Sequence, residues 1–193
     1  MAVQSSFKNM TVCLFAICLV CSALLAGVYA LTKEPIDAAA KAKNEAAIKD
    51  VLPETASAIE EERTVEMDGV TYTYNLAYDA SGNTVGCAIN VSTLGFGGPI
   101  AIKVGFDMNG VICNTKVLSQ AETPGLGAKC VEPAFSGQFK GFDPAEKKLS
   151  VKKDGGDVDA ITASTITSRA YADGLATAVK VFQTIGQTPM PLN

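Results

Sequence analysis

Hydroxyl side chains cluster near the C-terminal end of the chain, in the stretch from Asp159 to Ser168. They belong to Thr162, Ser164, Thr165, Thr167 and Ser168. Such oxygens either cap the free N–H groups at the start of a helix or surround a phosphate that those N–H groups bind. Arg169 would add a positive charge to a phosphate site. Asp154 and Asp157, together with Asp159, oppose a free anion unless a cation or a covalent bond intervenes.

A helix is expected directly after this cluster, because apolar residues recur there at steps of three and four. They are Tyr171, Leu175, Ala178, Phe182 and Ile185. Gly186 is expected to end the helix. The hydroxyl cluster therefore lies where the helix begins, and capping alone accounts for one or two of its members.

The same stretch resembles the flavinylation motif of the FMN-binding domain family, Asp-x-x-Ser/Thr-Gly-Ala-Thr, whose final threonine carries FMN through a phosphoester. On this sequence the motif's acid falls on Asp159, its first hydroxyl on Thr162 and its acceptor on Thr165. Ala163 stands where the family has glycine, and it is strained if the loop needs a positive φ there. Ser164 stands where the family has alanine.

Two glycine-rich stretches resemble further signatures of the same family, in the family's order. One is Glu-Thr-Pro-Gly-Leu-Gly at residues 122–127, and the other is Gly-Phe-Gly-Gly-Pro at residues 95–99. The family includes the G subunits of Rnf-type ion-translocating ferredoxin:NAD oxidoreductases and the C subunits of sodium-translocating NADH:quinone oxidoreductases. The shortness of the chain favours the Rnf branch.

The resemblance implies a set of cofactor-binding residues. Thr165 would carry FMN covalently, Thr162 and Ser164 would shape the phosphate loop, and Ser164 and Thr167 are rival attachment hydroxyls. The flavin ring or ribityl chain would be bordered by Glu122, Thr123, Leu126 and Gly127. Glu122 would tune the flavin potential. Without the resemblance, Glu122 is equally well explained as a carboxylate in an exposed surface turn. A separate flavin transferase would make the bond, since the chain has no nucleotide-transfer motif.

Composition excludes several classes of function. The chain has 193 residues, a formal charge of −4 and a pI near 4.9, which argues against nucleic-acid binding. It has no histidine, so His-based triads and His-rich metal sites are excluded. Three cysteines lie in an apolar run, and Cys87, Cys113 and Cys130 form no C-x-x-C pair. No G-x-G-x-x-G fingerprint follows a strand, so NAD binding is not expected.

An apolar run from Thr11 to Leu31 is long enough to cross a bilayer as a helix, which takes about 20 residues. Lys8 and the amino terminus favour a cytoplasmic N-terminus under the positive-inside bias. The rival interpretation is a cleaved secretory signal with a cleavage site at Val28-Tyr29-Ala30. We therefore divide the chain into a cytoplasmic N-terminus (1–10), a transmembrane helix in contact with lipid (11–31), a juxtamembrane helix and linker (32–63), and an extracytoplasmic FMN-binding domain (64–193).

The fold class expected for that domain is α+β. Residues 36–52 are predicted to be a helix that serves as a solvated spacer and ends at Pro53, and residues 60–63 are predicted to be an exposed connection. From Val70 onward, alternating apolar residues separated by turns at residues 79–83 and 107–110 and a loop at residues 95–99 predict strands up to Leu118, joined as an antiparallel meander. Flanking helices complete the domain, and the last one follows the flavin-attachment loop.

The resemblance implies an electron-transfer component of a membrane complex that couples electron transfer between ferredoxin and NAD to Na⁺ or H⁺ translocation. Its partners would be the other membrane subunits of that complex, and the protein would lie in the cell membrane as a single-pass protein. One alternative is an anchored FMN domain of a sodium-translocating NADH:quinone oxidoreductase or of another extracytoplasmic electron-transfer chain. Another is a membrane-anchored interaction domain without flavin, in which the hydroxyl cluster is only a helix cap.

Overall fold

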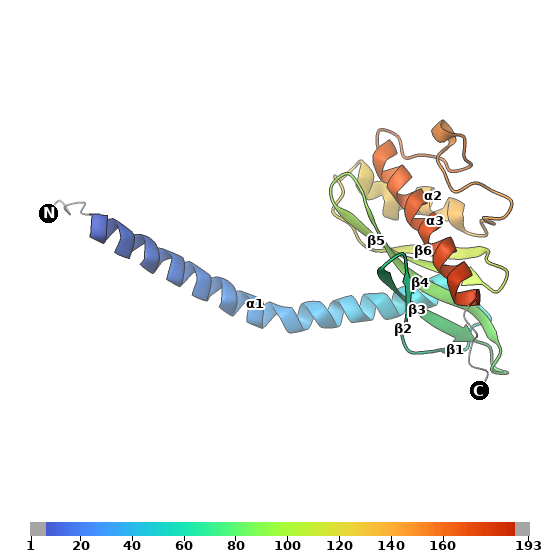
Figure 1. The fold of residues 1–193 in the computed structure, drawn as a ribbon, viewed down its shortest axis with the longest axis horizontal. Coiled ribbons are helices and arrows are strands. Elements are labelled where there is room, and N and C mark those ends of the chain that lie inside the picture. Colours follow the sequence, from blue (N-terminus) through green and yellow to red (C-terminus); the bar gives the residue numbers. More distant parts are fainter. Residues whose placement is uncertain (1–6, 188–193) are drawn as a thin grey trace. The chain divides into compact units, whose positions relative to one another are not determined.

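The computed structural model describes residues 7–187 and divides into two compact units at residues 43 and 44. The first unit contains most of helix α1 (Phe7–Val51) (Figure 1). Every described side chain up to residue 43 is exposed. α1 is long and apolar enough to cross a membrane. Large apolar side chains exposed on all sides of a helix need lipid or another protein around them.

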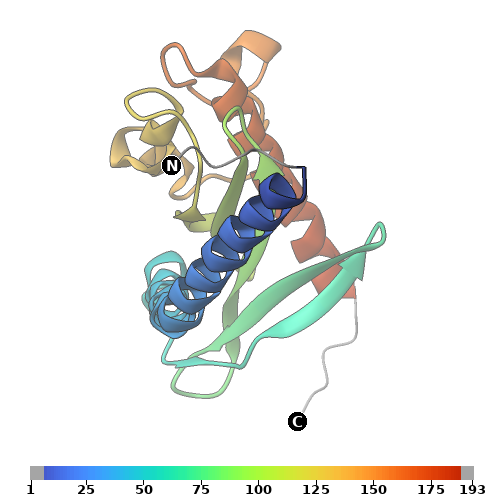
Figure 2. The ribbon, with the colours of Figure 1, turned by 90° about the vertical axis from the view of Figure 1, so that its left-hand side faces the viewer.

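The second unit is built on a six-stranded antiparallel sheet with strand order β1-β3-β4-β5-β6, and β2 also pairs with β3. The strands are β1 (Ala58–Ile59), β2 (Arg63–Met67), β3 (Val70–Tyr78), β4 (Thr84–Leu94), β5 (Pro99–Asp107) and β6 (Ile112–Ser119). Neighbouring strands from β3 to β6 follow one another in the chain, so the predicted α+β fold with an antiparallel meander is confirmed. β2 and β3 form a long hairpin (Figure 2).

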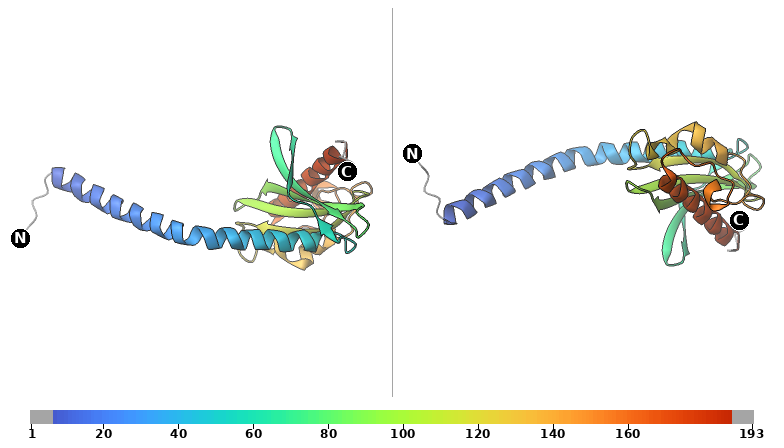
Figure 3. Two further views of the ribbon diagram at one scale, coloured as in Figure 1. Left: turned by 90° about the horizontal axis from the view of Figure 1, so that it is seen from below. Right: turned by 90° about the horizontal axis from the view of Figure 1, so that it is seen from above.

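One face of the sheet is covered by helix α3 (Thr165–Gln187), which packs on β4 and β5 (Figure 3, right). The core between them is apolar and fully enclosed at Ile89, Ile102, Val104, Tyr171 and Leu175. The apolar face predicted for this helix is confirmed, although Phe182 remains half-buried. Gly186 does not end the helix as predicted, because α3 continues through it to Gln187.

Short elements connect β6 to α3. They are the 3₁₀ helix η1 (Gly127–Val131), α2 (Pro133–Ser136), and the 3₁₀ helices η2 (Gly137–Phe139) and η3 (Lys152–Asp154). Phe135 and Phe139 from this connection pack against Tyr171 of α3, with ring centroids 5.2 Å apart in both pairs. This aromatic group holds the connection against the start of α3, where the hydroxyl cluster lies.

The helix predicted for residues 36–52 is present as the end of α1, but from Asn44 onward it belongs to the second unit and is not a solvated spacer. Ala47, Ile48 and Val51 are buried, and they pack on Ala77 and Ala88 of the sheet. The compact unit begins at Asn44, and it includes β1 and β2. The sequence pattern did not predict this contact, because a few apolar side chains are enough to pack closely on a sheet face made of small residues.

Of the predicted connection at residues 60–63, residues 60–62 join β1 to β2 and Arg63 begins β2, and Glu60 and Arg63 are partly buried. Glu60 is bonded by Arg63 and by the Tyr78 hydroxyl, whose distance to Glu60 Oε2 is 2.9 Å. Burial and this bond raise the pKa of Tyr78. The charged segment is therefore tied to the sheet at both of its ends.

Candidate functional site

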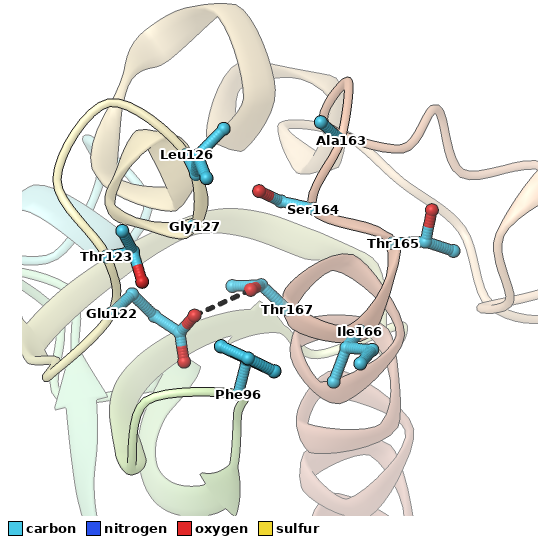
Figure 4. A pocket seen from close by; sticks show the side chains of 10 residues that line it. All are labelled: Phe96, Glu122, Thr123, Leu126, Gly127, Ala163, Ser164, Thr165, Ile166 and Thr167. Carbon is cyan, nitrogen blue, oxygen red and sulfur yellow. Dashed lines mark hydrogen bonds between the residues drawn. The ribbon is translucent and has the colours of Figure 1, made fainter.

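A pocket of about 400 Å³ opens where three segments meet (Figure 4). These are the β4–β5 connection, the turn that follows β6, and the first turn of α3. Its lining residues are Phe96, Glu122, Thr123, Leu126, Gly127, Ala163, Ser164, Thr165, Ile166 and Thr167. The three motifs singled out in the sequence lie far apart along the chain, and they converge on one pocket.

The carboxylate of Glu122 joins the three segments. Its Oε2 accepts a hydrogen bond from Thr167 Oγ1 at 2.7 Å, and its Oε1 accepts one from the Gly97 backbone N–H at 3.0 Å (Figure 4). The side chain is 6% exposed. The interpretation of Glu122 as a surface-turn carboxylate is therefore wrong: it is a buried and partnered acid at the wall of the pocket.

Glycines make room for this carboxylate. A Cβ atom at Gly127 would overlap Glu122 Oε2 and lie 2.7 Å from Thr167 Oγ1. A Cβ atom at Gly95 would overlap Glu122 Oε1 in the same way. The two glycine-rich stretches therefore have a common physical cause, since both must approach the Glu122 side chain more closely than any other residue permits.

The start of α3 offers backbone donors to the pocket. The helical hydrogen bonds begin with Ser168 N donating to Ser164 O at 3.1 Å. The N–H groups of Thr165, Ile166 and Thr167 precede this bond and have no acceptor within the helix. Since these three residues line the pocket, the positive end of the helix dipole and its free amides suit a phosphate there.

The clustered hydroxyls have different roles. Ser168 Oγ accepts from Ile161 N at 2.9 Å and donates to Ser164 O at 2.9 Å, so it is a structural group. Thr167 is committed to Glu122 and is 1% exposed. Ser164 is also buried, whereas Thr165 is half-buried at the pocket. Among the hydroxyls of this first turn, Thr165 is the one that both lines the pocket and remains accessible.

Ala163 has a backbone φ of +60°. The strain expected for alanine at the family's glycine position is therefore present, because a Cβ atom is disfavoured in this left-handed conformation. Neighbouring bonds hold the loop in place: Ser164 N donates to Ile161 O at 3.0 Å, and Ile161 N donates to Ser168 Oγ. The loop geometry thus survives the alanine at a cost of about 1 kcal/mol.

Two of the predicted site residues lie outside the pocket. Asp159 and Thr162 line a separate hollow of about 220 Å³ beside Lys129, Phe135 and Gln138. Asp159 forms an ion pair with Lys152, with its Oδ1 at 2.7 Å from the lysine Nζ. Thr162 is exposed. The chain turns at Ala163, between Thr162 and Ser164. Asp159 and Thr162 therefore do not share a cavity with Thr165.

Arg169 does not face the pocket either, which corrects its expected role as a phosphate ligand. Its guanidinium binds both oxygens of Asp154, at 2.7 Å and 2.8 Å, and these bonds lower the pKa of that carboxyl group. Asp157 Oδ2 accepts from the Lys148 backbone N–H at 2.7 Å. The acidic residues upstream of α3 are thus engaged with their own neighbours, and none of them lines the pocket.

Phe96 and Ile166 also line the pocket, although neither was expected there from the sequence. Their side chains are 70% and 53% exposed, and with Leu126 they form apolar walls of the pocket. The sequence contains an indication for Phe96, since a large aromatic residue between the glycines of a turn cannot be buried in the core. It contains none for Ile166, because an apolar residue in the first turn of an amphipathic helix is normally buried. Among residues 7–187, no group of three or more acidic or cysteine side chains could hold a metal ion.

Comparison with known proteins agrees with this geometry. The FMN-binding domain model matches residues 95–180, which contain the whole pocket, and the RnfG N-terminal region model matches residues 1–51. The chain is 33% identical to the G subunit of the ion-translocating oxidoreductase complex of Methanosarcina acetivorans over 183 residues, or 93% of this chain and 96% of that protein.

Two further likenesses extend the comparison. The G subunit of the Na⁺-translocating ferredoxin:NAD⁺ oxidoreductase complex of Acetobacterium woodii is 34% identical over 113 residues, covering 56% of this chain and 54% of that protein. The crystal structure of the C subunit of the Na⁺-translocating NADH-quinone reductase from Parabacteroides distasonis shares the fold, with a TM-score of 0.52 at 23% identity over 68% of this chain and 80% of that one. The match to the Methanosarcina protein over nearly its whole length, together with both family models, shows that the chain belongs to the family of G subunits of ion-translocating oxidoreductase complexes.

Proposed function

We propose that the chain is the covalently flavinylated electron-transfer component of a membrane complex that couples electron transfer between ferredoxin and NAD to ion translocation. The observation that carries this proposal is the pocket at the start of α3, where a half-buried threonine, free helix amides and apolar walls meet. The relative from Acetobacterium woodii supports the assignment to the ferredoxin:NAD reaction.

The residues present fit FMN. A pocket of about 400 Å³ is within the size range of small-molecule sites. Phe96, Leu126 and Ile166 offer apolar surface to a planar ring, and the amides of Thr165–Thr167 offer donors to its phosphate. Gly127 keeps the wall beside Glu122 free of a side chain. When bound, the flavin supplies one- and two-electron chemistry, and the protein sets its position and its surroundings.

Thr165 is the attachment residue in this proposal. The hydroxyl of Thr167 is already donated to Glu122, and Ser164 is 7% exposed. Thr162 lies outside the pocket. A flavin transferase needs an accessible hydroxyl beside the phosphate-binding amides, and Thr165 meets both conditions. Asp159 and Thr162 then act at the outer surface, where the transferase would dock, and not on the flavin.

Glu122 is the acid closest to the proposed ring site. Among the lining residues of the pocket it is the one ionisable side chain. A negative charge beside the flavin disfavours added electrons, so Glu122 would hold the flavin potential low. Thr123, Leu126 and Gly127 come from the same turn and would border the ring or the ribityl chain.

The topology completes the proposal. Residues 11–31 would cross the bilayer in contact with lipid, with residues 1–10 in the cytoplasm and the FMN domain outside it. Covalent attachment is advantageous there, because a dissociated nucleotide would be lost from the cell. The other membrane subunits of the complex would be the partners of this chain.

The test is to co-produce the full chain with a flavin transferase, denature it, and examine the gel band under ultraviolet light. Wild type should fluoresce and Thr165→Ala should not. Ser164→Ala is the matched control, since it restores the residue that the family motif has, and its band should stay bright. Fluorescence that survives Thr165→Ala would move the bond to another hydroxyl. A dark wild-type band would overturn the flavin assignment altogether.

A further inference from the structure

The face of the sheet opposite α3 holds a second enclosed region, beneath the last turns of α1 (Figure 3, left). Strand register places residues of three adjacent strands together on this face. Among them are Asn75 and Ala77 of β3, Ala88 and Asn90 of β4, and Lys103 and Gly105 of β5. Asn90 lies directly opposite Lys103, and Ala88 lies opposite Gly105. The alanine and glycine end is covered by Ile48 and Val51. Asn44 lies on α1 about one helical turn before Ile48.

Lys103 is fully buried there, with 0% exposure. Among the residues that the structure describes, its Nζ has no hydrogen-bond partner. A buried ammonium group without any partner costs several kcal/mol, so a lysine in this position needs a compensating group. Desolvation lowers the pKa of Lys103 to about 8, against a weaker opposing effect of the Glu62 carboxylate, which leaves most molecules charged at neutral pH.

Three side-chain oxygens in the same region lack a partner as well. They are Asn44 Oδ1, Asn75 Oδ1 and Asn90 Oδ1, and all are buried within the described part of the chain. Two of these amides are held by their nitrogen atoms. Asn75 Nδ2 donates to Glu60 O at 3.2 Å, and Asn90 Nδ2 donates to Thr73 Oγ1 at 2.7 Å. Because the nitrogens are committed, the oxygens cannot turn away to find donors elsewhere.

The chemistry of the unpartnered atoms identifies the ligand. An ammonium group requires acceptors, and three carbonyl oxygens require donors. A metal cation would satisfy the oxygens but would be repelled by Lys103, and an anion would satisfy Lys103 but would be repelled by the oxygens. Water accepts and donates at the same time, and buried water commonly makes about three hydrogen bonds to such groups.

We propose that Lys103 Nζ and the side-chain oxygens of Asn44, Asn75 and Asn90 form an internal hydration site that fastens the last turns of α1 to the sheet. Asn44 is the residue that the site draws from α1, while the other three come from three adjacent strands. Ordered water there connects α1 to β3, β4 and β5 through hydrogen bonds, beside the apolar contact of Val51. The site lies on the opposite face of the sheet from α3 and is independent of the flavin proposal.

The first test is a structure of the full chain in lipid at a resolution that shows ordered water. Water within hydrogen-bonding distance of Lys103 Nζ and of at least two of the three asparagine oxygens is the expected result. Direct bonds between Nζ and those oxygens, with no water between them, would overturn the proposal.

The second test is hydrogen exchange of the α1 backbone at residues 47–51, measured in the full chain in lipid. Asn44→Ala removes the one side-chain oxygen that α1 contributes to the site, and exchange at these residues should become about tenfold faster. Lys116→Met is the matched control. Lys116 also contacts the end of α1, with its Nζ 2.9 Å from Asp50 Oδ2, but this ion pair is half-exposed and should contribute little. Equal exchange rates in Asn44→Ala and wild type would contradict the fastening role.

Discussion

Glu122 and Lys103 are both buried charged residues of the second unit. They differ in whether groups of the protein form hydrogen bonds with the buried charge. Glu122 receives a hydroxyl donor from Thr167 and a backbone donor from Gly97, so the protein itself satisfies its carboxylate. Lys103 has no such partner among residues 7–187. The acid is held by two loops and the first turn of α3 around an open pocket, whereas the lysine is enclosed between regular elements.

The difference teaches what each region is suited for. Loops rich in glycine can be arranged around one carboxylate and still leave about 400 Å³ for a ligand. Strands and a helix are less adaptable, because their side chains have fixed directions. Polar atoms on that face of the sheet are therefore connected in our proposal by hydrogen bonds through a water molecule. We therefore assign cofactor binding to the Glu122 region and attachment of α1 to the Lys103 region.

The largest effects are predicted for two glycine substitutions, one in each region. In Gly105→Ala the new Cβ atom overlaps the carbonyl group of Val51, which cannot rotate away, and we expect a loss of roughly 3 kcal/mol of stability. In Gly127→Ala the Cβ atom meets the Glu122 side chain, which can move, so we expect a smaller loss of stability and poor flavin incorporation. Thermal unfolding and flavin per protein measure the two effects.

Gly137→Ala is the control for both, since that glycine has helical dihedral angles and nothing within 4 Å of a new Cβ atom. Its stability and its flavin content should match those of wild type. Loss of flavin in Gly105→Ala without unfolding would show that the two regions are not separate.

A pH titration tests the charge of Lys103. Its pKa is lowered from 10.5 to about 8, so between pH 8 and 10.5 the unfolded chain binds more protons than the folded one. The free energy of unfolding therefore rises with pH in that window, by up to about 3 kcal/mol from Lys103, because a neutral amine can be buried without the cost of burying a charge. Lys103→Met should lack this rise. The measurement is chemical unfolding of both proteins across that range, and parallel curves would contradict the lowered pKa.

Thr167→Val removes one donor to Glu122 at nearly constant volume. The carboxylate Oε2 is then left without this partner, so we expect a loss of about 1–2 kcal/mol. Flavin should still attach, because Thr167 is not the acceptor in our proposal. Gel fluorescence together with thermal unfolding would show both. A stable variant without flavin would instead identify Thr167 as the attachment residue.

The smallest predicted effect is a gain. Ala163→Gly relieves the strain of φ +60° and should stabilise the chain by about 0.5–1 kcal/mol. Ala145→Gly is the control, since Ala145 is exposed and has no positive φ, so glycine there should be neutral or slightly destabilising. A destabilised Ala163→Gly variant would show that the alanine methyl group makes contacts that outweigh the strain.

The sequence predicted the parts of this fold that rest on local patterns. Alternation of apolar residues identified β3 to β6, and the spacing from Tyr171 to Ile185 identified α3. β1 and β2 were missed, because β1 has only two residues and β2 carries two charged residues among its five. The docking of α1 was missed as well, since it depends on small residues on the partner face.

The pocket was predictable in its motifs and not in its geometry. Resemblance placed Thr165, Ser164, Glu122 and Gly127 in one site, and they line one pocket. It also included Asp159 and Thr162, which the turn at Ala163 directs elsewhere. Arg169 shows the same limit, because nothing local indicates that its partner is Asp154, fifteen residues earlier in the chain.

The most direct test of the central claim is to locate the flavin on the chain by mass spectrometry. Trypsin should release residues 154–169 as one peptide, since no lysine or arginine lies between Lys153 and Arg169. That peptide contains all the candidate hydroxyls of the cluster. We predict one added FMN phosphoester, with fragment ions that place it on Thr165. An FMN located on Thr162, Ser164 or Thr167, or a peptide without any added mass from protein matured by the transferase, would contradict the account.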